Sequence, residues 1–258
     1  MTDPLIIAHR GASAHAPENT FAAFQMAIDM GADGLEFDVR LSRDGVPVVI
    51  HDIDLLRIAG RPEKISDLSA DDLAEVDVGL WFNTAFPARA RPEFAAQRIK
   101  TLAETLRFLD AFPGRIYIEL KCMLDDAEAI SKAVCSLICD SPLLPQIVVK
   151  TFTLSVIPLV RTQCPNAKIG ALFEPTFRTV FRKTKNIIAL AKAAGADQLS
   201  IHYSLATLRL CRLAAQSEMP MTVWTTDDTR WLARARQRGI NALITNDPLL
   251  FHGLRSER

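Results

Sequence analysis

The feature that most constrains the fold is an alternation of short apolar runs with helical patterns along nearly the whole chain. Eight runs of four to eight residues, rich in Val, Ile and Leu, predict strands buried on both faces. They are Leu5–Ala8, Gly34–Leu41, Arg115–Leu120, Gln146–Phe152, Lys168–Phe173, Gln198–Ile201, Met221–Thr225 and Ala242–Thr245. Strand–helix alternation indicates parallel strands with crossover helices. With 258 residues, the chain is predicted to be a single α/β domain, a (β/α)8 TIM barrel over 1–258.

The segments between these runs have the spacing of amphipathic helices. Phe21, Phe24 and Ile28 fall on one stripe, with Asn19 or Thr20 available as N-cap. The predicted helices are Thr20–Met30, Leu102–Leu109, Asp126–Ile138, Leu154–Arg161, Thr179–Ala194, Leu205–Ala215 and Thr229–Arg238.

One interval breaks the alternation, after the second predicted strand. A turn at Ser42–Gly45 leads into an apolar piece, Val46–His51, which indicates a hairpin. The next residues, about 53–98, include several aromatic residues and prolines and are too long for an ordinary connection. We predict a small insertion after the second strand, which either lines a pocket at one end of the barrel or decorates its periphery.

Composition narrows the classes of partner. Lys plus Arg number 30 and Asp plus Glu number 30, so no net charge would attract nucleic acid or an anionic membrane. The five cysteines lack zinc or disulfide spacing, which indicates free thiols in a reducing compartment. The N-terminal residues lack a signal-peptide pattern, and no apolar run approaches the ~20 residues that span a bilayer. We expect a cytoplasmic protein with a small-molecule substrate and no stable membrane association; the oligomeric state stays open.

Acidic residues gather within one predicted strand and at the end of the next. Glu36 and Asp38 are two apart on one strand and therefore share a face, and Glu119 ends the next strand. Carboxylates inside a barrel repel each other unless a cation lies between them. A divalent cation with oxygen ligands, Mg²⁺ or Ca²⁺, is the expected neutraliser. The alternative is a metal-free set paired with Arg10, Arg40 and Lys121.

Two histidines, His9 and His51, also follow predicted strands beside these carboxylates. Imidazole is the side chain best suited to proton transfer near pH 7, so the pair indicates general acid/base catalysis, although either alone could be a packed or surface residue. Arg10 and Lys121 would supply positive charge to a phosphodiester oxygen, or serve only as salt-bridge partners.

At these residues the sequence resembles the glycerophosphodiester phosphodiesterase family over nearly its whole length. The segments that carry the resemblance are His9–Ala12, Pro17–Thr20, Gly34–Val39, Asp44–Asp52, Glu119–Lys121, Val223–Thr225 and Ile244–Pro248, in this order. Lys100 and Asp227 depart from the family pattern, which usually has Pro and Asn there.

The resemblance implies an α/β barrel with an insertion after the second strand, and hydrolysis of glycerophosphodiesters to sn-glycerol 3-phosphate and an alcohol. It implies that Glu36, Asp38 and Glu119 bind the cation and that His9 and His51 are the acid/base pair. It further implies that Arg10 and Lys121 contact the phosphate, that Asn19 contacts the active site and that Trp224 lines the glycerol end. A first hypothesis makes His51 the base and His9 the acid.

Two other functions fit parts of the same pattern. Lys121 at a strand end could be the amine of a Schiff-base aldolase, but three adjacent carboxylates would keep it protonated. Alternatively, the chain could bind phosphate esters without turning them over. The preferred head group, the native metal and the use of lysophospholipids stay open.

Overall fold

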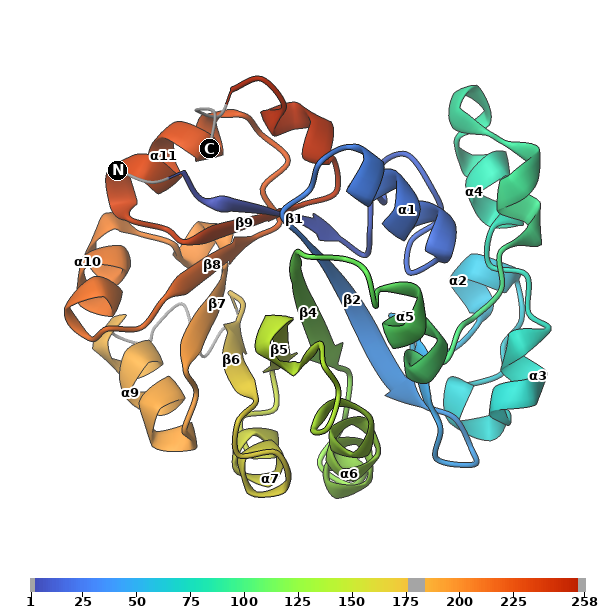
Figure 1. The fold of residues 1–258 in the computed structure, drawn as a ribbon, viewed down its shortest axis with the longest axis horizontal. Coiled ribbons are helices and arrows are strands. Elements are labelled where there is room, and N and C mark those ends of the chain that lie inside the picture. Colours follow the sequence, from blue (N-terminus) through green and yellow to red (C-terminus); the bar gives the residue numbers. More distant parts are fainter. Residues whose placement is uncertain (1–2, 176–183, 255–258) are drawn as a thin grey trace.

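The structure is a computed structural model that describes residues 3–175 and 184–254. Eight parallel strands close into a barrel with helices outside it, as predicted (Figure 1). The strands are β1 (Leu5–His9), β2 (Gly34–Leu41), β4 (Arg115–Leu120), β5 (Ile147–Thr151), β6 (Lys168–Phe173), β7 (Gln198–His202), β8 (Met221–Trp224) and β9 (Ala242–Thr245). Pairing of β1 with both β2 and β9 closes the ring. The predicted hairpin is also confirmed, because β3 (Pro47–Val49) pairs antiparallel with β2.

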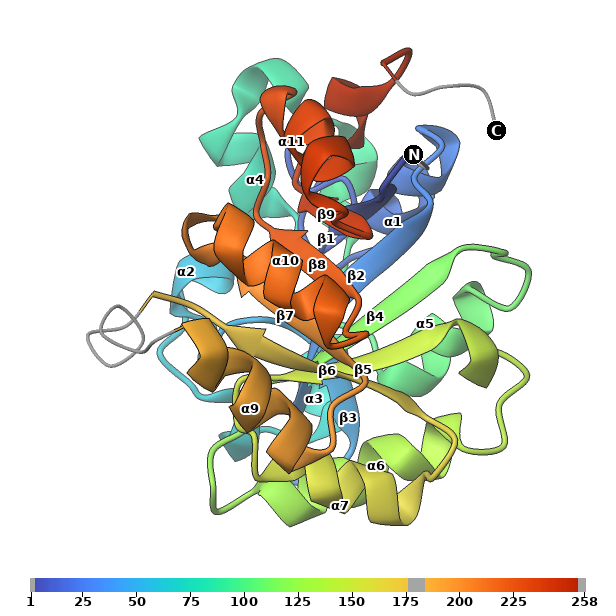
Figure 2. The ribbon, with the colours of Figure 1, turned by 90° about the vertical axis from the view of Figure 1, so that its left-hand side faces the viewer.

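Seven of the described helices cover the barrel. They are α1 (Phe21–Asp29), α5 (Leu102–Phe108), α6 (Ala127–Ile138), α7 (Val156–Gln163), α9 (Thr184–Ala194), α10 (Leu208–Gln216) and α11 (Arg230–Arg238). Figure 2 shows α9, α10 and α11 on the side of the barrel that faces the viewer. The start predicted for α10 was three residues early, because Tyr203–Leu205 forms a 3₁₀ turn and Thr207 caps the helix by accepting from the Leu210 amide. Residues 179–183 of another predicted helix lie outside the described residues. None of the described helices is long and apolar enough to cross a bilayer.

Alternation along β2 separates apolar side chains that face the helices from acidic side chains that face the barrel interior. On β2, Leu35, Phe37 and Val39 belong to the main core between strands and helices, where Phe37 packs against Phe24 of α1. The residues between them, Glu36 and Asp38, therefore point into the barrel.

A second, smaller apolar cluster fills part of the barrel interior. It consists of Ile7, Tyr117, Val148, Ala242 and Ile244, with Leu5 and Trp224 packed against it. On β1, β4 and β5 the residue two positions further along is polar: His9, Glu119 and Lys150. The barrel thus has an apolar layer below a polar layer, and the polar layer lies toward the carboxyl ends of the strands.

The segment between β3 and α5 folds over one flank of the barrel, beside β2 and α1 (Figure 1). It contains α2 (Leu56–Ala59), α3 (Ala70–Ala74) and α4 (Leu80–Ala85), together with three 3₁₀ turns, Ile65–Asp67, Pro87–Arg89 and Pro92–Ala96. Part of its core, which includes Leu55, Ile65 and Leu73, packs on Val48 of β3. Its bounds as a subdomain at about 53–98 stay a prediction.

Candidate active site

Three buried carboxylates meet in the polar layer of the barrel. Register places Asp38 of β2 directly opposite Glu119 of β4, and Glu36 opposite His9 of β1. One carboxylate oxygen from each of Glu36, Asp38 and Glu119 lies within 4.8 Å of the other two. All three residues are at most 6% exposed. The structure thus brings together the residues that the sequence suggested for a metal.

The three carboxylates do not share one electrostatic environment. Burial, followed by the charge of Asp38, raises the pKa of both Glu36 and Glu119 to about 7. Burial also acts on Asp38, but Arg10 and Lys121 outweigh it and hold the pKa of Asp38 well below its usual range. The site holds one firmly ionised carboxylate and two whose ionised forms a further cation would stabilise.

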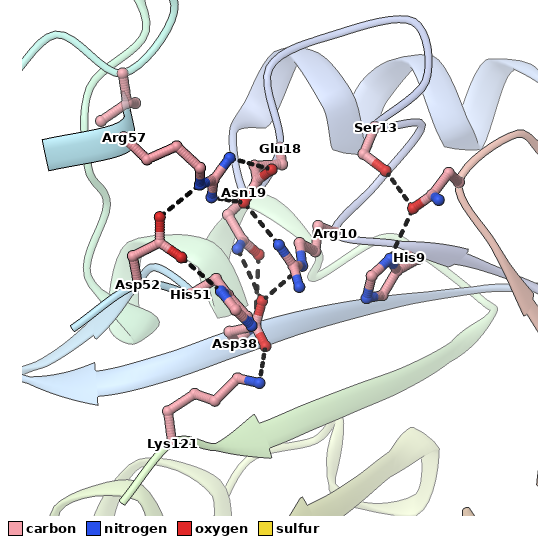
Figure 3. A network of polar contacts seen from close by, with 12 residues as sticks. His9, Arg10, Ser13, Glu18, Asn19, Asp38, His51, Asp52, Arg57 and Lys121 are labelled. Atoms are coloured by element: carbon pink, nitrogen blue, oxygen red, sulfur yellow. Dashed lines mark hydrogen bonds and ion pairs between the residues drawn. The ribbon is translucent and has the colours of Figure 1, made fainter. Parts of the chain in front are cut away.

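Arg10 and Lys121 approach the Asp38 carboxylate from opposite sides, as Figure 3 shows. The Arg10 Nε lies 3.1 Å from Asp38 Oδ2. The Lys121 Nζ lies 3.3 Å from Asp38 Oδ1 and 2.5 Å from Glu119 Oε1. Burial opposes the charged form of Lys121, yet these two carboxylates outweigh it and raise the pKa of Lys121 above its ordinary value. Lys121 is therefore a fixed cation.

The loop after β1 places Arg10 by adopting strained backbone. Arg10 and Asn19 have φ of 57° and 58°, in the left-handed region that side chains with a Cβ rarely adopt. The Asn19 backbone amide donates to the Arg10 carbonyl. The Asn19 side chain bonds Asp38 twice: Nδ2 donates to Asp38 Oδ2 (3.0 Å), and Oδ1 accepts from the Asp38 amide (3.3 Å). These bonds hold both strained residues in place.

Gly11 follows directly and packs against α1. Its φ is +81°, and a Cβ there would lie 2.6 Å from the Ala23 carbonyl carbon. We expect Gly11→Ala to lower the free energy of unfolding by about 2–5 kcal/mol, since backbone strain and overpacking add. Thermal unfolding checks this, with a fall in Tm of roughly 5–15 °C. Gly239→Ala is the matched control, because Gly239 also has positive φ but a Cβ there meets no atom within 4 Å. Equal losses in the two variants would contradict the steric argument.

His9 lies at the end of β1, with its ring between a neutral partner and the carboxylates. Its Nδ1 is 2.7 Å from Asn246 Oδ1, and its Nε2 is 3.9 Å from Glu36 Oε2. Burial, and then the charge of Arg10, lower the pKa of His9 to about 4. His9 is therefore a neutral imidazole at pH 7.

His51 follows β3 and has a charged partner instead. Its Nδ1 is 2.7 Å from Asp52 Oδ1 (Figure 3). Arg57 of α2 donates through Nε to Asp52 Oδ2 (2.6 Å), and its terminal nitrogens donate to Glu18 at 2.6 and 3.0 Å. Glu18 also accepts from Arg10 at 2.8 Å. A chain of ion pairs thus connects the segment after β3 to both Arg10 and His51.

Aromatic side chains form a wall beside Lys121. The Lys121 Nζ lies 5.8 Å from the centroid of the Phe152 ring. Phe152 meets Trp224 edge-on at 5.6 Å, and Trp224 meets His202 at 5.2 Å. The Trp224 Nε1 is buried and has no hydrogen-bond acceptor among the described residues. Trp224, expected at the site, therefore borders it and has a free donor.

Sequence reasoning considered Lys150 only as a strand-end residue that could shape specificity, and it gave Asp52, Arg57 and Asn246 no role. Lys150 is fully buried opposite Glu119, with its Nζ 4.2 Å from the Tyr117 ring centroid. The sequence feature that indicates a role for Lys150 is a lysine inside an otherwise apolar strand. Asp52, Arg57 and Asn246 were missed because their contacts appear only in the folded chain. Asn246 contacts His9 and Asp52 contacts His51, whereas Arg57 pairs with Asp52.

Comparisons with known proteins agree on one family. Residues 9–250 match the glycerophosphoryl diester phosphodiesterase family. A glycerophosphodiester phosphodiesterase of Caldanaerobacter subterraneus subsp. tengcongensis is 28% identical over 244 residues, which cover 95% of this chain and 94% of that protein. One from Bacillus subtilis (strain 168) is 28% identical over 258 residues, which cover 96% and 85%.

Solved structures of such proteins have the same fold. The glycerophosphodiester phosphodiesterase of Thermotoga maritima is 26% identical, with a TM-score of 0.76 and coverage of 99% of this chain and 100% of that one. An Oleispira antarctica phosphodiesterase, solved in complex with the product sn-glycerol-3-phosphate, has a TM-score of 0.81 at 23% identity, with coverage of 96% and 94%.

Proposed function

The chain belongs to the glycerophosphoryl diester phosphodiesterase family, and from this premise we propose a specific reaction and mechanism for it. The enzyme hydrolyses glycerophosphodiesters to sn-glycerol 3-phosphate and an alcohol, with a divalent cation and two histidines. The observation that carries this proposal is the set of three buried carboxylates with two fixed cations and two histidines at one end of the barrel.

The carboxylates fit a divalent cation such as Mg²⁺ or Ca²⁺. Oxygens up to 4.8 Å apart can contact one ion at the ~2.3–2.6 Å typical of Ca²⁺, or close slightly around Mg²⁺. Burial, followed by the charge of Asp38, raises the pKa of Glu36 and Glu119, and this supports a further cation beside them. When bound, the metal would neutralise these ligands and polarise the phosphodiester oxygens.

Arg10 and Lys121 would bind the phosphodiester. Each keeps its positive charge through the ion pair with Asp38, and each is only 15–17% exposed, so it is partly desolvated. Cations held in this way stabilise charge that develops on phosphoryl oxygens without first having to reorganise. Asn19 uses both ends of its amide on Asp38, so we propose that it orients Asp38 and Arg10. Trp224 would border the glycerol end.

The partners of the two histidines support opposite roles. His9 has a neutral acceptor at Nδ1 and a pKa lowered by burial and by Arg10, so it can accept a proton at Nε2. His51 has the Asp52 carboxylate at Nδ1, which orients the ring and leaves Nε2 to exchange a proton with the substrate. We therefore assign the general base to His9 and the general acid to His51, the reverse of the hypothesis from sequence. His9 removes the proton of the nucleophile, which is either water or the glycerol hydroxyl, and His51 protonates the leaving alkoxide. If the hydroxyl attacks first, water then opens the cyclic phosphate to give sn-glycerol 3-phosphate.

The Schiff-base alternative lacks support. An amine that attacks a carbonyl must lose its proton. Lys121 keeps its proton, because Asp38 and Glu119 outweigh burial and raise its pKa.

A substrate panel tests the proposed function. Glycerophosphocholine, glycerophosphoethanolamine, glycerophosphoglycerol and a lysophospholipid are incubated with the chelated protein and again after separate addition of Mg²⁺ and Ca²⁺. We expect release of sn-glycerol 3-phosphate from at least one glycerophosphodiester, only with metal present. Binding of these esters without turnover would favour a non-catalytic protein, and activity that survives chelation would refute the metal.

A further inference from the structure

Asp227, in the loop after β8, accepts three hydrogen bonds. Its Oδ1 accepts from the Thr245 hydroxyl (2.8 Å) and from the Asn246 backbone amide (2.8 Å). Its Oδ2 accepts from the Asn246 side-chain Nδ2 (2.5 Å). An ionised carboxylate can only accept, so all three partners must present hydrogens to it.

This arrangement determines the orientation of the Asn246 amide. The oxygen and nitrogen of an Asn side chain have nearly the same shape, so their placement depends on the hydrogen-bond network around them. Because the Asp227 carboxylate can only accept, the NH₂ group of Asn246 must face Asp227. The Oδ1 atom then faces the other way, where it accepts from the Ser13 hydroxyl at 3.0 Å and lies 2.7 Å from His9 Nδ1.

The orientation of that amide in turn determines which nitrogen of His9 carries the proton. An acceptor opposite Nδ1 requires the hydrogen of the neutral ring to be on Nδ1. The lone pair is then on Nε2, the nitrogen that lies toward Glu36. The Nδ1 atom of His51 contacts a carboxylate, that of Asp52, directly. In contrast, the neutral amide of Asn246 lies between the His9 ring and the Asp227 carboxylate.

We propose that Asp227 is a positioning residue that acts through Asn246 to hold His9 in the tautomer with the proton on Nδ1 and the lone pair on Nε2. Its effect on catalysis rests on the proposed role of His9 as base. Asp227 itself touches neither the carboxylates nor the histidine in the contacts that the structure describes. Asp227 affects the His9 ring because it excludes one of the two orientations that the Asn246 side-chain amide could otherwise adopt.

Replacement of Asp227 by Asn is expected to reverse the network without disturbing its shape. The backbone amide of Asn246 cannot rotate, so the new side-chain oxygen must stay opposite it and opposite Thr245. The NH₂ group of the new side chain at position 227 then faces Asn246. To accept from it, the Asn246 side chain must turn its oxygen toward residue 227. The NH₂ group of Asn246 would then face His9 Nδ1, so Nδ1 becomes an acceptor and the proton moves to Nε2.

The test reads the tautomer directly. In protein labelled with ¹⁵N at histidine, two-bond ¹H–¹⁵N spectra distinguish protonated from unprotonated ring nitrogens, and His9→Gln identifies the His9 signals. At pH 7.5 we expect Nδ1–H in the native protein and Nε2–H in Asp227→Asn. We also expect kcat on a glycerophosphodiester to fall about 10- to 100-fold, the usual range when a partner that orients a functional histidine is lost, with little change in KM.

The control is Asp228→Asn. Asp228 is the next residue along the chain and pairs with Arg230, so this change is expected to leave the His9 tautomer and kcat unchanged. Asp227→Ala provides a second reading, because it leaves Asn246 free to turn and should give a mixture of tautomers, even if the Asn variant fails to fold.

The outcomes separate this inference from the proposed function. If both Asp227 variants keep Nδ1–H on His9, the positioning role is overturned, whatever the activity. If the tautomer changes as expected but the native protein hydrolyses no glycerophosphodiester, the inference about His9 stands and the proposed function fails. If the tautomer changes and kcat does not, the link between His9 and catalysis is wrong.

Discussion

Alanine in place of either His9 or His51 is expected to lower kcat by about 10²–10⁴-fold, the usual contribution of a general acid or base. Neither change should prevent folding, because the His9 and His51 side chains are partly exposed, at 18% and 31%. Initial rates on a glycerophosphodiester at saturating metal measure the effect. His252→Ala is the control, since His252 is exposed and follows the last 3₁₀ turn, Pro248–Phe251. Near-native rates in either active-site variant would refute its role.

A change of leaving group distinguishes the acid from the base. Loss of p-nitrophenolate needs little protonation, so a p-nitrophenyl phosphodiester should restore most of the activity of His51→Ala. The same substrate should not help His9→Ala, because its nucleophile still has to lose a proton. The opposite pattern would return the base to His51 and the acid to His9.

Replacement of Glu36, Asp38 or Glu119 by the corresponding amide is expected to abolish metal binding and to lower kcat/KM at least about 10²-fold. This expectation exceeds the 10- to 100-fold loss typical of residues that merely support metal ligands. Asp38→Asn should have the largest effect, since Asp38 also holds Arg10, Lys121 and Asn19. Calorimetric titration with Mg²⁺ and Ca²⁺ measures the affinity, with Glu63→Gln, on the surface, as control.

Stability gives a second measure of the same changes. A ligand that binds only the folded protein raises Tm with its concentration. We expect Mg²⁺ or Ca²⁺ to raise the Tm of the native protein but not that of Glu36→Gln. Without metal, Glu36→Gln should not lower Tm, because the change removes a buried charge that Asp38 repels. If metal raised the Tm of Glu36→Gln as much as that of the native protein, Glu36 would not be a ligand.

Much of the fold and the centre of the site could be predicted because they depend on local patterns. Apolar runs of strand length, separated by helical stripes, require a parallel sheet, and eight of them can close it. The two-residue repeat places Glu36 and Asp38 on one face of their strand, and Glu119 lies near the carboxyl end of the next strand of the barrel, where functional groups of such barrels gather. No long-range information is needed for either step.

The tertiary structure alone decided how these groups are paired. The bond between His9 and Asn246 joins residues 237 positions apart, and it exists because β9 returns to β1 when the barrel closes. Arg57 reaches Asp52 and Glu18 only through the fold of the segment after β3. Periodicity says which face a side chain occupies, whereas hydrogen bonds and pKa shifts depend on distances of a few ångströms between distant parts of the chain. The sequence by itself therefore determined the barrel and its reactive groups, whereas the contacts between distant groups, such as His9 with Asn246 and Arg57 with Glu18, depend on how the folded chain brings its segments together.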